Sequence, residues 1–187
     1  DQHPTQALLD VYTLQRSFEE RGGIDGKRIV FVGDLQRGRT VRSLSVLLTQ
    51  YRDVEQCFVA PDVLQIGEDI QGILRQRGVR FSLSSELRRE LPSADAVYMT
   101  RVQNEWDAIK GESDQIDISR FCIGRDELAL LSPAAVIMHP LPRREEISPD
   151  VDSDPRAVYW RQMRNGMWVR AALIASIFKE EHRIDEY

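Results

Sequence analysis

The chain has 187 residues, of which 42% are hydrophobic and 29% are charged, and its formal net charge at pH 7 is −5. That length allows one good-sized hydrophobic core or a modest pair of cores. A mildly acidic chain is a poor candidate for a dedicated nucleic-acid binder, and no apolar run approaches the ~20 residues that a membrane span needs.

The first predicted element is a helix over residues 4–20. Pro4 suits the first turn of a helix, where its missing N–H is not needed, and Gly22-Gly23 ends the pattern. Apolar side chains recur between them at helical spacing. We expect this stripe to pack against the core: Leu8, Val11, Tyr12 and Phe18.

Five short apolar runs then predict strands, because they are rich in β-branched or aromatic residues and most are flanked by Gly, Pro, Asp or Ser. They lie at 28–32, 56–61, 79–83, 96–100 and 135–140. Helical patterns occupy 40–51, 66–77, 85–90 and 124–131, and a last long helix is predicted at 157–180.

Strands that alternate with helices indicate βαβ units and a parallel sheet. We predict the fold class α/β, a Rossmann-like three-layer domain with a central parallel sheet of about five strands and helices on both faces. Residues 1–187 form one domain in this interpretation. In the common strand order 3-2-1-4-5, ligands bind at the carboxyl ends of the strands, where the chain switches direction between strands 1 and 4.

Three segments follow the carboxyl ends of predicted strands 1, 4 and 5. They are GDLQRGRT (33–40), TRVQ (100–103) and HPLPR (139–143). Together they offer several guanidinium groups, an amide and an imidazole, and the planar fork of arginine matches carboxylate and phosphate. These segments predict a crevice for a small substrate that carries several anionic groups.

The start of the first helix adds His3 and Gln6, which are three residues apart and share one helix face. Backbone N–H groups and the helix dipole favour an anion there. A histidine can polarise a carbonyl group, and a glutamine can hold an amide or an amine. Taken alone, a histidine at a helix start is more often a cap or a surface residue.

Gly33 and Gly38, followed by Arg39 and Thr40, come within one residue of the phosphate loop G-x-x-x-x-G-K-[ST]. Arginine does not replace the compact charge of that lysine. A P-loop enzyme also needs an aspartate at a strand end to hold magnesium, and the runs AVYMT and AVIMH lack one. The dinucleotide pattern G-x-G-x-x-G is absent as well, so the sequence disfavours both kinds of nucleotide site.

Other polar groups are expected to be structural. The two cysteines, Cys57 and Cys122, are too few for a disulfide framework or a zinc cluster and are predicted to be buried small hydrophobes, so no metal site is expected. With no export signal, we expect a cytoplasmic location. The acidic pair Glu145-Glu146 is predicted to lie in a solvated loop.

Five segments, taken together and in this order, resemble the aspartate carbamoyltransferase family and specifically its C-terminal, aspartate-binding half. They span essentially the whole chain: HPTQALLD (3–10), VGDLQRGRTVRSL (32–44), YMTRVQ (98–103), MHPLPRREEI (138–147) and RQMRNGMWVRAALI (161–174). HPTQ marks the wider carbamoyltransferase family, whereas GRT, TRVQ and HPLPR single out aspartate as the acceptor. The ornithine enzymes typically carry His-Cys-Leu-Pro after strand 5, where this chain has Pro140 instead of the cysteine.

The resemblance implies transfer of the carbamoyl group from carbamoyl phosphate to the α-amino group of L-aspartate, giving N-carbamoyl-L-aspartate and phosphate in de novo pyrimidine biosynthesis. It implies no cofactor and no covalent intermediate. His3 would be the catalytic residue and contact the carbamoyl oxygen, and Gln6 would contact the carbamoyl amino group. Leu141 and Pro142 would offer backbone carbonyls to the same nitrogen.

The resemblance also assigns the groups that hold the acceptor. Arg39 and Arg101 would bind the carboxylates of aspartate, with Gln103 in support. Arg37 stands where the family varies and receives no role. The loop at 33–40 is then a carboxylate-binding loop on a Rossmann-like frame rather than an altered phosphate loop.

One part of the family's pattern is absent from the chain. The family binds phosphate through a Ser-x-Arg-Thr loop in an N-terminal domain and takes a serine and a lysine from a neighbouring subunit of a trimer. The chain has no Ser-x-Arg-Thr and opens without a methionine. We therefore expect a piece of a longer polypeptide, in which helices 4–20 and 157–180 link to a missing N-terminal carbamoyl phosphate domain.

The expected whole enzyme is a homotrimer, with or without regulatory chains. Alone, the chain is expected to turn over little or no substrate, and the apolar face of helix 157–180 is expected to be exposed. The alternative is a non-catalytic carbamoyltransferase-like binding or scaffold module. A phosphate loop upstream in the natural polypeptide distinguishes the two.

Overall fold

The computed structural model describes residues 2–103 and 116–183. Its strands are parallel and form one sheet in the order β3-β2-β1-β4-β5. They are β1 (Arg28–Val32), β2 (Glu55–Val59), β3 (Arg80–Ser84), β4 (Ala96–Met99) and β5 (Val136–Met138). The predicted fold class is confirmed, the strands take the common order 3-2-1-4-5, and the chain switches direction between β1 and β4.

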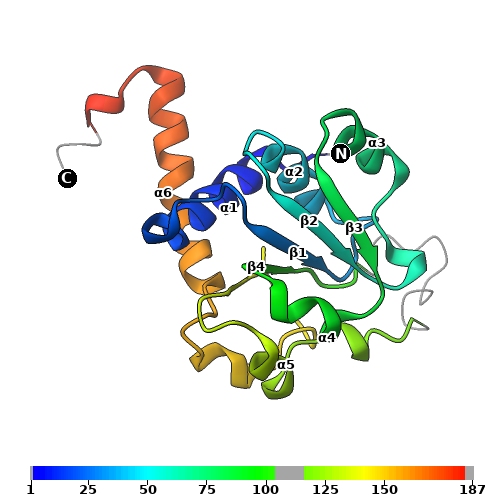
Figure 1. The fold of residues 1–187 in the computed structure, drawn as a ribbon. Helices are drawn as coiled ribbons and strands as arrows, with labels where there is room; N and C mark the ends of the chain where they lie inside the picture. The colour runs from blue at the N-terminus through cyan, green and yellow to red at the C-terminus, as the bar shows by residue number, and fades with distance from the viewer. Residues whose placement is uncertain (1, 104–115, 184–187) are drawn as a thin grey trace.

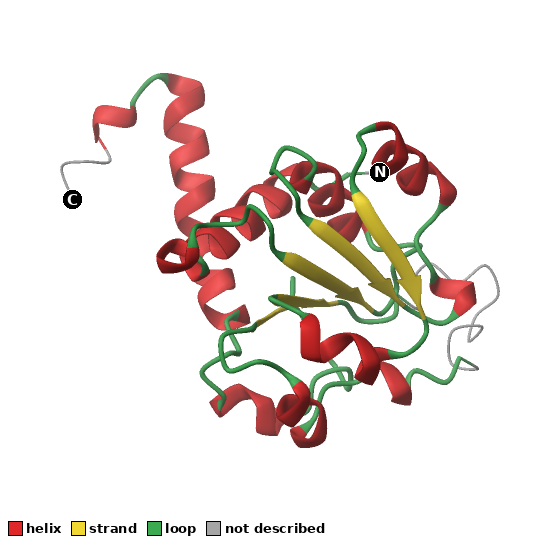
Figure 2. Ribbon diagram, in the orientation of Figure 1, coloured by secondary structure: helices red, strands yellow, loops and turns green. Residues whose placement is uncertain are grey.

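Helices cover both faces of the sheet (Figures 1 and 2). The helices are α1 (Pro4–Ser17), α2 (Arg39–Leu48), α3 (Glu68–Gln76), α4 (Leu87–Glu90), α5 (Arg125–Leu130) and α6 (Tyr159–Phe178). Short 3₁₀ turns lie between or after them: η1 (Glu19–Arg21), η2 (Asp62–Leu64), η3 (Leu91–Ser93), η6 (Ser119–Phe121), η7 (Pro149–Ser153) and η8 (Glu181–Arg183). Helices α1, α2 and α3 pack on one face, and α4 and α5 pack on the other, which confirms the three layers.

Alternate residues of the strands feed two hydrophobic cores, one on each face of the sheet. Phe31, Phe58 and Tyr98 point toward α1, α2 and α3, and the rings of Phe31 and Phe58 stack with centroids 5.2 Å apart. Val30 and Val97 point toward α4 and α5. The central strands are therefore buried on both faces, which fixes the carboxyl ends of β1 and β4 side by side.

The first helix is shorter than predicted, and its apolar stripe is less buried. Helix α1 ends at Ser17, and the chain turns through η1 to Gly22, whose φ of 82° is left-handed and suits glycine. Phe18 is fully buried, but Leu8 and Tyr12 are 40% and 43% exposed, so the predicted packing is wrong for these two. Helix α1 packs against α2 and α6, and neither covers this part of its surface.

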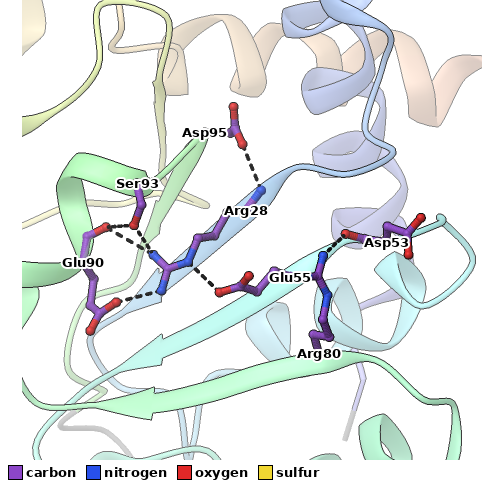
Figure 3. Close-up of polar contacts among 7 residues, drawn as sticks. All are labelled: Arg28, Asp53, Glu55, Arg80, Glu90, Ser93 and Asp95. Atoms are coloured by element: carbon purple, nitrogen blue, oxygen red, sulfur yellow. Dashed lines mark hydrogen bonds and ion pairs between the residues drawn. The ribbon is translucent and has the colours of Figure 1, made fainter.

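Arg28 joins the amino ends of three strands (Figure 3). Its Nε donates to Glu55 at 2.7 Å, its Nη2 donates to Glu90 at 2.7 Å, and its Nη1 donates to Ser93 at 2.9 Å. Its backbone N–H donates to the carboxylate of Asp95, just before β4, at 3.0 Å. These charged contacts hold the end of the sheet opposite the predicted site.

Helix α6 runs from the body of the domain outward (Figure 1). Its first turns pack against α1 and β5, where Tyr159, Gln162 and Gly166 are buried. Its large exposed apolar side chains are Trp160, Met163, Met167, Trp168, Ile174, Ile177 and Phe178. The expected exposure of this helix is confirmed. Among the described residues, no helix is both long enough and apolar enough to cross a membrane.

Candidate functional site

A cavity of about 220 Å³ opens where the segments that follow β1, β4 and β5 meet the start of α1. The residues that line it are His3, Gln6, Arg39, Thr40, Thr100, Arg101, Gln103, His139, Pro140, Leu141 and Pro142. All seven site residues predicted from the sequence belong to this set. The other four, Thr40, Thr100, His139 and Pro140, adjoin them along the chain.

Gly33 lets the end of β1 approach the end of β4 closely. Its φ is 114°, and a Cβ at this position would lie 2.1 Å from the carbonyl oxygen of Thr100. Glycine alone accepts both this backbone conformation and this contact. The loop that leads to Arg39 therefore passes directly beside the segment that carries Arg101.

Asp34 ties these two arginine-bearing segments together. It is fully buried, its Oδ1 accepts the backbone N–H of Arg37 at 3.0 Å, and its Oδ2 accepts the backbone N–H of Gln103 at 3.2 Å. Arg37, which received no role from the sequence, donates from Nη1 to the carbonyl of Gln103 at 3.3 Å. The backbones that carry Arg39 and Arg101 are thus held together by hydrogen bonds.

His3 stands at the start of α1 with its backbone fixed on both sides. Its N–H donates to Ser43 Oγ at 2.7 Å, and its carbonyl accepts the N–H groups of Gln6 and Ala7 at 3.1 Å each. Burial and the nearby charges of Arg39 and Arg170 lower the pKa of the imidazole. His3 is therefore neutral at pH 7, with one ring N–H to donate.

His139 shapes the loop after β5. Its buried ring accepts the backbone N–H of Leu141 at Nδ1 (2.8 Å), so its proton lies on Nε2, which donates to Glu146 at 2.7 Å. Glu146 is 5% exposed, so the prediction of a solvated acidic pair is wrong for this residue. Burial raises the pKa of Glu146, but the bonds from His139 and from the N–H of Arg144 outweigh burial and leave that pKa lowered. A buried carboxylate is stable here because it has these donors.

Leu141 and Pro142 line the cavity in an uncommon backbone conformation. Leu141 has a φ of 52°, in the left-handed region that leucine rarely occupies, and the peptide bond between the two residues is cis. The hydrogen bond from Leu141 to the ring of His139 holds this turn. Left-handed residues of this kind cluster at ligand-binding sites.

Sequence reasoning missed Asp10, a carboxyl group that is fully buried beside the cavity. Its Oδ1 accepts Gln6 Nε2 at 2.9 Å and Gln162 Nε2 at 2.7 Å, and its Oδ2 accepts the hydroxyl of Tyr98 at 2.7 Å. Burial outweighs these bonds and raises the pKa of Asp10 to about 7. The available signal was the spacing of four residues between Gln6 and Asp10, which puts both on one helix face. We call Asp10 and its three partners, Gln6, Gln162 and Tyr98, the Asp10 cluster.

Across residues 2–103 and 116–183, no group of three or more His, Cys, Asp or Glu side chains could hold a metal ion. Cys57 is buried and Cys122 is half-buried, and burial raises the pKa of both thiols, which makes them poor nucleophiles. The polar side chains that line the cavity carry two guanidinium groups, two imidazoles, two amides and two hydroxyl groups.

Residues 25–177 match the family described as aspartate/ornithine carbamoyltransferase, Asp/Orn binding domain. The protein named aspartate carbamoyltransferase 1, chloroplastic, from Pisum sativum is 46% identical over 173 residues. That match covers 92% of this chain and 44% of the pea protein. The chain therefore spans less than half the length of this relative.

Solved structures share the fold. The catalytic subunit of M. jannaschii aspartate transcarbamoylase matches with a TM-score of 0.84 at 38% identity, over 97% of this chain and 57% of that chain. Aspartate transcarbamoylase from Trypanosoma cruzi, in complex with carbamoyl phosphate and aspartate, matches with a TM-score of 0.78 at 37% identity. The second match covers 92% of this chain and 54% of that chain.

Proposed function

Because the chain belongs to the aspartate/ornithine carbamoyltransferase family, we propose that it supplies the aspartate-binding half of an enzyme that carbamoylates L-aspartate. The carbamoyl group comes from carbamoyl phosphate, and the products are N-carbamoyl-L-aspartate and phosphate, in pyrimidine biosynthesis. The observation that carries this proposal is the single cavity in which His3, Gln6, Arg39 and Arg101 meet. The trypanosomal relative, whose structure holds both substrates, supports the same choice of ligands.

The charges of the cavity favour a dicarboxylate acceptor. Arg39 and Arg101 both line it, and planar guanidinium groups match carboxylates. An ornithine side chain would bring an ammonium group against these cations, which is unfavourable. Pro140, in the position where ornithine enzymes typically carry cysteine, agrees with aspartate as the acceptor.

The reaction needs positioning and charge stabilisation. The neutral amine of aspartate attacks the carbamoyl carbon, a tetrahedral oxyanion forms, and phosphate leaves with the electrons of the broken C–O bond and takes up the proton that the amine nitrogen loses. In this proposal the neutral ring of His3 donates its N–H to the oxyanion, and Gln6, Leu141 and Pro142 accept hydrogen bonds from the carbamoyl nitrogen. Gln103 supports the bound aspartate. These roles need oriented hydrogen bonds rather than a covalent intermediate.

We propose further that an N-terminal carbamoyl phosphate domain packs on α1 and α6, and that the whole enzyme is a cytoplasmic homotrimer, with or without regulatory chains. The exposed apolar side chains of both helices support a covering partner. Sedimentation of the whole enzyme tests the trimer. Cell fractionation tests the location, with the plastid as the contrary outcome because the pea relative is named chloroplastic.

The test of function is carbamoyl-aspartate formation by two proteins, the 187-residue chain and the same chain extended upstream to its natural start. We expect activity only in the longer protein. There, Arg101→Ala should lower kcat/KM for aspartate by about 10²-fold, because a buried charge left without its partner costs about 2–5 kcal/mol. Arg52→Ala, an exposed arginine at the far end of the sheet, is the matched control and should leave kcat/KM unchanged.

Two outcomes would contradict the proposal. Carbamoylation of ornithine rather than aspartate would overturn the acceptor assignment. Folded protein with no activity in either form would leave a non-catalytic binding or scaffold module that uses the arginines for another anion.

A further inference from the structure

Asp10 is a buried acidic side chain that the mechanism above does not use. We propose that Asp10 is a positioning residue that fixes the amide of Gln6 with its oxygen toward the cavity, so that the site selects ligands with an NH₂ group over isosteric ligands with a methyl group. This inference rests on the proposed function and identifies the side chain that lets the site distinguish the donor substrate from ligands with a methyl group in place of NH₂.

The nitrogen of the Gln6 amide is hydrogen-bonded within the protein, whereas its oxygen is open to the cavity. Its Nε2 donates to Asp10 at 2.9 Å, and the side chain lines the cavity. Within the described residues, its Oε1 accepts no hydrogen bond, although every fully buried side-chain polar atom there has a partner. The oxygen of Gln6 therefore reaches the open space of the cavity, where a ligand donor can meet it.

Asp10 determines which end of the amide faces that space. A carboxyl oxygen without a proton only accepts hydrogen bonds, so the amide turns its nitrogen toward Asp10 and its oxygen away. Oδ1 accepts both Gln6 and Gln162, whereas Oδ2 faces the hydroxyl of Tyr98. A proton on Asp10 is accommodated at Oδ2, and Oδ1 still accepts both amides. The orientation of Gln6 is the same in both protonation states.

The Asp10 cluster is anchored on several elements. Tyr98 comes from β4, and Gln162 of α6 also accepts the backbone N–H of His139 at 2.9 Å. Gln6 and Gln162 are 8% and 1% exposed, and Asp10 is fully buried. A buried network with its hydrogen bonds made holds each side chain in one conformation. Gln6 is thereby presented rigidly beside the loop that begins at His139.

The chemistry of selection follows from this orientation. A carbamoyl group offers an N–H donor to the oxygen of Gln6, whereas the acetyl group of acetyl phosphate offers a methyl group of similar size. In an enclosed site, an acceptor left without its donor disfavours the wrong ligand more than a poor apolar contact does. A Gln6 amide that could rotate freely would present either end and would lose this discrimination.

The test uses the full natural polypeptide that contains this chain. Competition binding gives the ratio of Kd for acetyl phosphate to Kd for carbamoyl phosphate, and carbamoyl-aspartate formation is measured in parallel. Asp10→Leu removes the acceptor, and we expect the ratio to fall at least about tenfold. Asp10→Asn keeps an oxygen for both amides and turns its NH₂ toward Tyr98, so the ratio should stay within about threefold of the natural value.

Tyr159→Phe is the matched control, because it removes the hydrogen bond from another buried tyrosine hydroxyl, to Asp152, outside the Asp10 cluster, and it should leave the ratio unchanged. If Asp10→Leu does not fold, Asp10→Ser replaces it, since the shorter side chain does not reach Gln6. A folded Asp10→Leu or Asp10→Ser protein with the natural ratio overturns the inference. An Asp10→Asn protein whose ratio falls as far as that of Asp10→Leu also overturns it. If the unsubstituted protein binds carbamoyl phosphate but transfers nothing, the proposed function fails while the ratio still decides the role of Asp10.

Discussion

A single buried residue, Asp10, makes the stability of this fold depend on pH between about 4 and 7. Burial raises its pKa from 3.8 to about 7, against the hydrogen bonds of Tyr98, Gln162 and Gln6. Between these two values the native state keeps a proton that the unfolded state has lost. The free energy of unfolding therefore falls as pH rises through this window, by up to about 4 kcal/mol.

Urea unfolding at pH 5 and pH 7.5 measures this effect. Between those values the natural protein should lose about 2–3 kcal/mol more stability than Asp10→Asn, which has no such proton. His3, whose pKa is lowered, has the same effect in both proteins. The lowered pKa of Glu146 gives stability that is lost as pH falls below about 4.5, outside this range. An equal change in the free energy of unfolding between pH 5 and pH 7.5 in the two proteins would contradict the prediction.

The site residues that the sequence predicted differ in kind from those that it missed. His3, Gln6 and the arginines have polar or charged side chains and lie at strand ends or at a helix start, where ligands bind. Their residue types and positions in the sequence therefore indicate a site before any contact is known. The role of Asp10 depends on Tyr98, which is 88 residues away, and that of Asp34 depends on Gln103, which is 69 residues away. Such pairings exist only in the folded chain.

At the scale of elements, apolar runs rich in β-branched or aromatic residues predicted all five strands of the sheet but overestimated where some of them end. The run predicted at 56–61 ends as a strand at Val59, and the run predicted at 135–140 forms a strand only over Val136–Met138. In both cases a proline follows closely and cannot donate to the ladder. After β5, the residues released from the ladder, beginning at His139, form the cavity wall.

The loop between β1 and α2 depends on Gly33. Gly33→Ala should destabilise the fold by about 3 kcal/mol or more, because its Cβ would meet the carbonyl oxygen of Thr100 at 2.1 Å and its φ is 114°. The substitution should also weaken aspartate binding in the whole enzyme, since it displaces the backbones that carry Arg39 and Arg101. Thermal unfolding and the KM for aspartate measure the two effects.

Gly72 is the matched control for this substitution. It lies inside α3, and a Cβ there would meet no atom within 4 Å. Gly72→Ala should therefore stabilise the protein by about 0.5–1 kcal/mol, because alanine loses less conformational freedom in a helix. A Gly33→Ala protein as stable as Gly72→Ala would show that the close approach of β1 to β4 is not required.

Across the whole molecule, the two ends of the sheet have different tasks. The amino ends are joined by the charged contacts of Arg28 with Glu55, Glu90 and Asp95 (Figure 3). The carboxyl ends keep their polar groups around the cavity instead. Neither end of the sheet accounts for the exposed apolar side chains of α6.

Those side chains should drive association of the isolated chain, because burying apolar area contributes about 25 cal/mol per Å². Trp168, Ile174 and Phe178 are 59%, 57% and 72% exposed. Changing all three to Gln should lower the association constant of the 187-residue chain at least about tenfold in sedimentation. In the longer polypeptide, the same changes should weaken packing of the N-terminal domain and reduce carbamoyl transfer.

The control pairs two exposed apolar residues that lie away from α6, Val63 in η2 and Leu83 in β3. Changing both to Ser removes apolar surface without altering α6, so association and transfer should stay at their natural values. Equal effects of the two sets would mean that general hydrophobicity, rather than one helix face, drives association. Loss of self-association without loss of transfer would instead mean that α6 contacts a second copy of the chain and leaves the N-terminal domain to be held by α1.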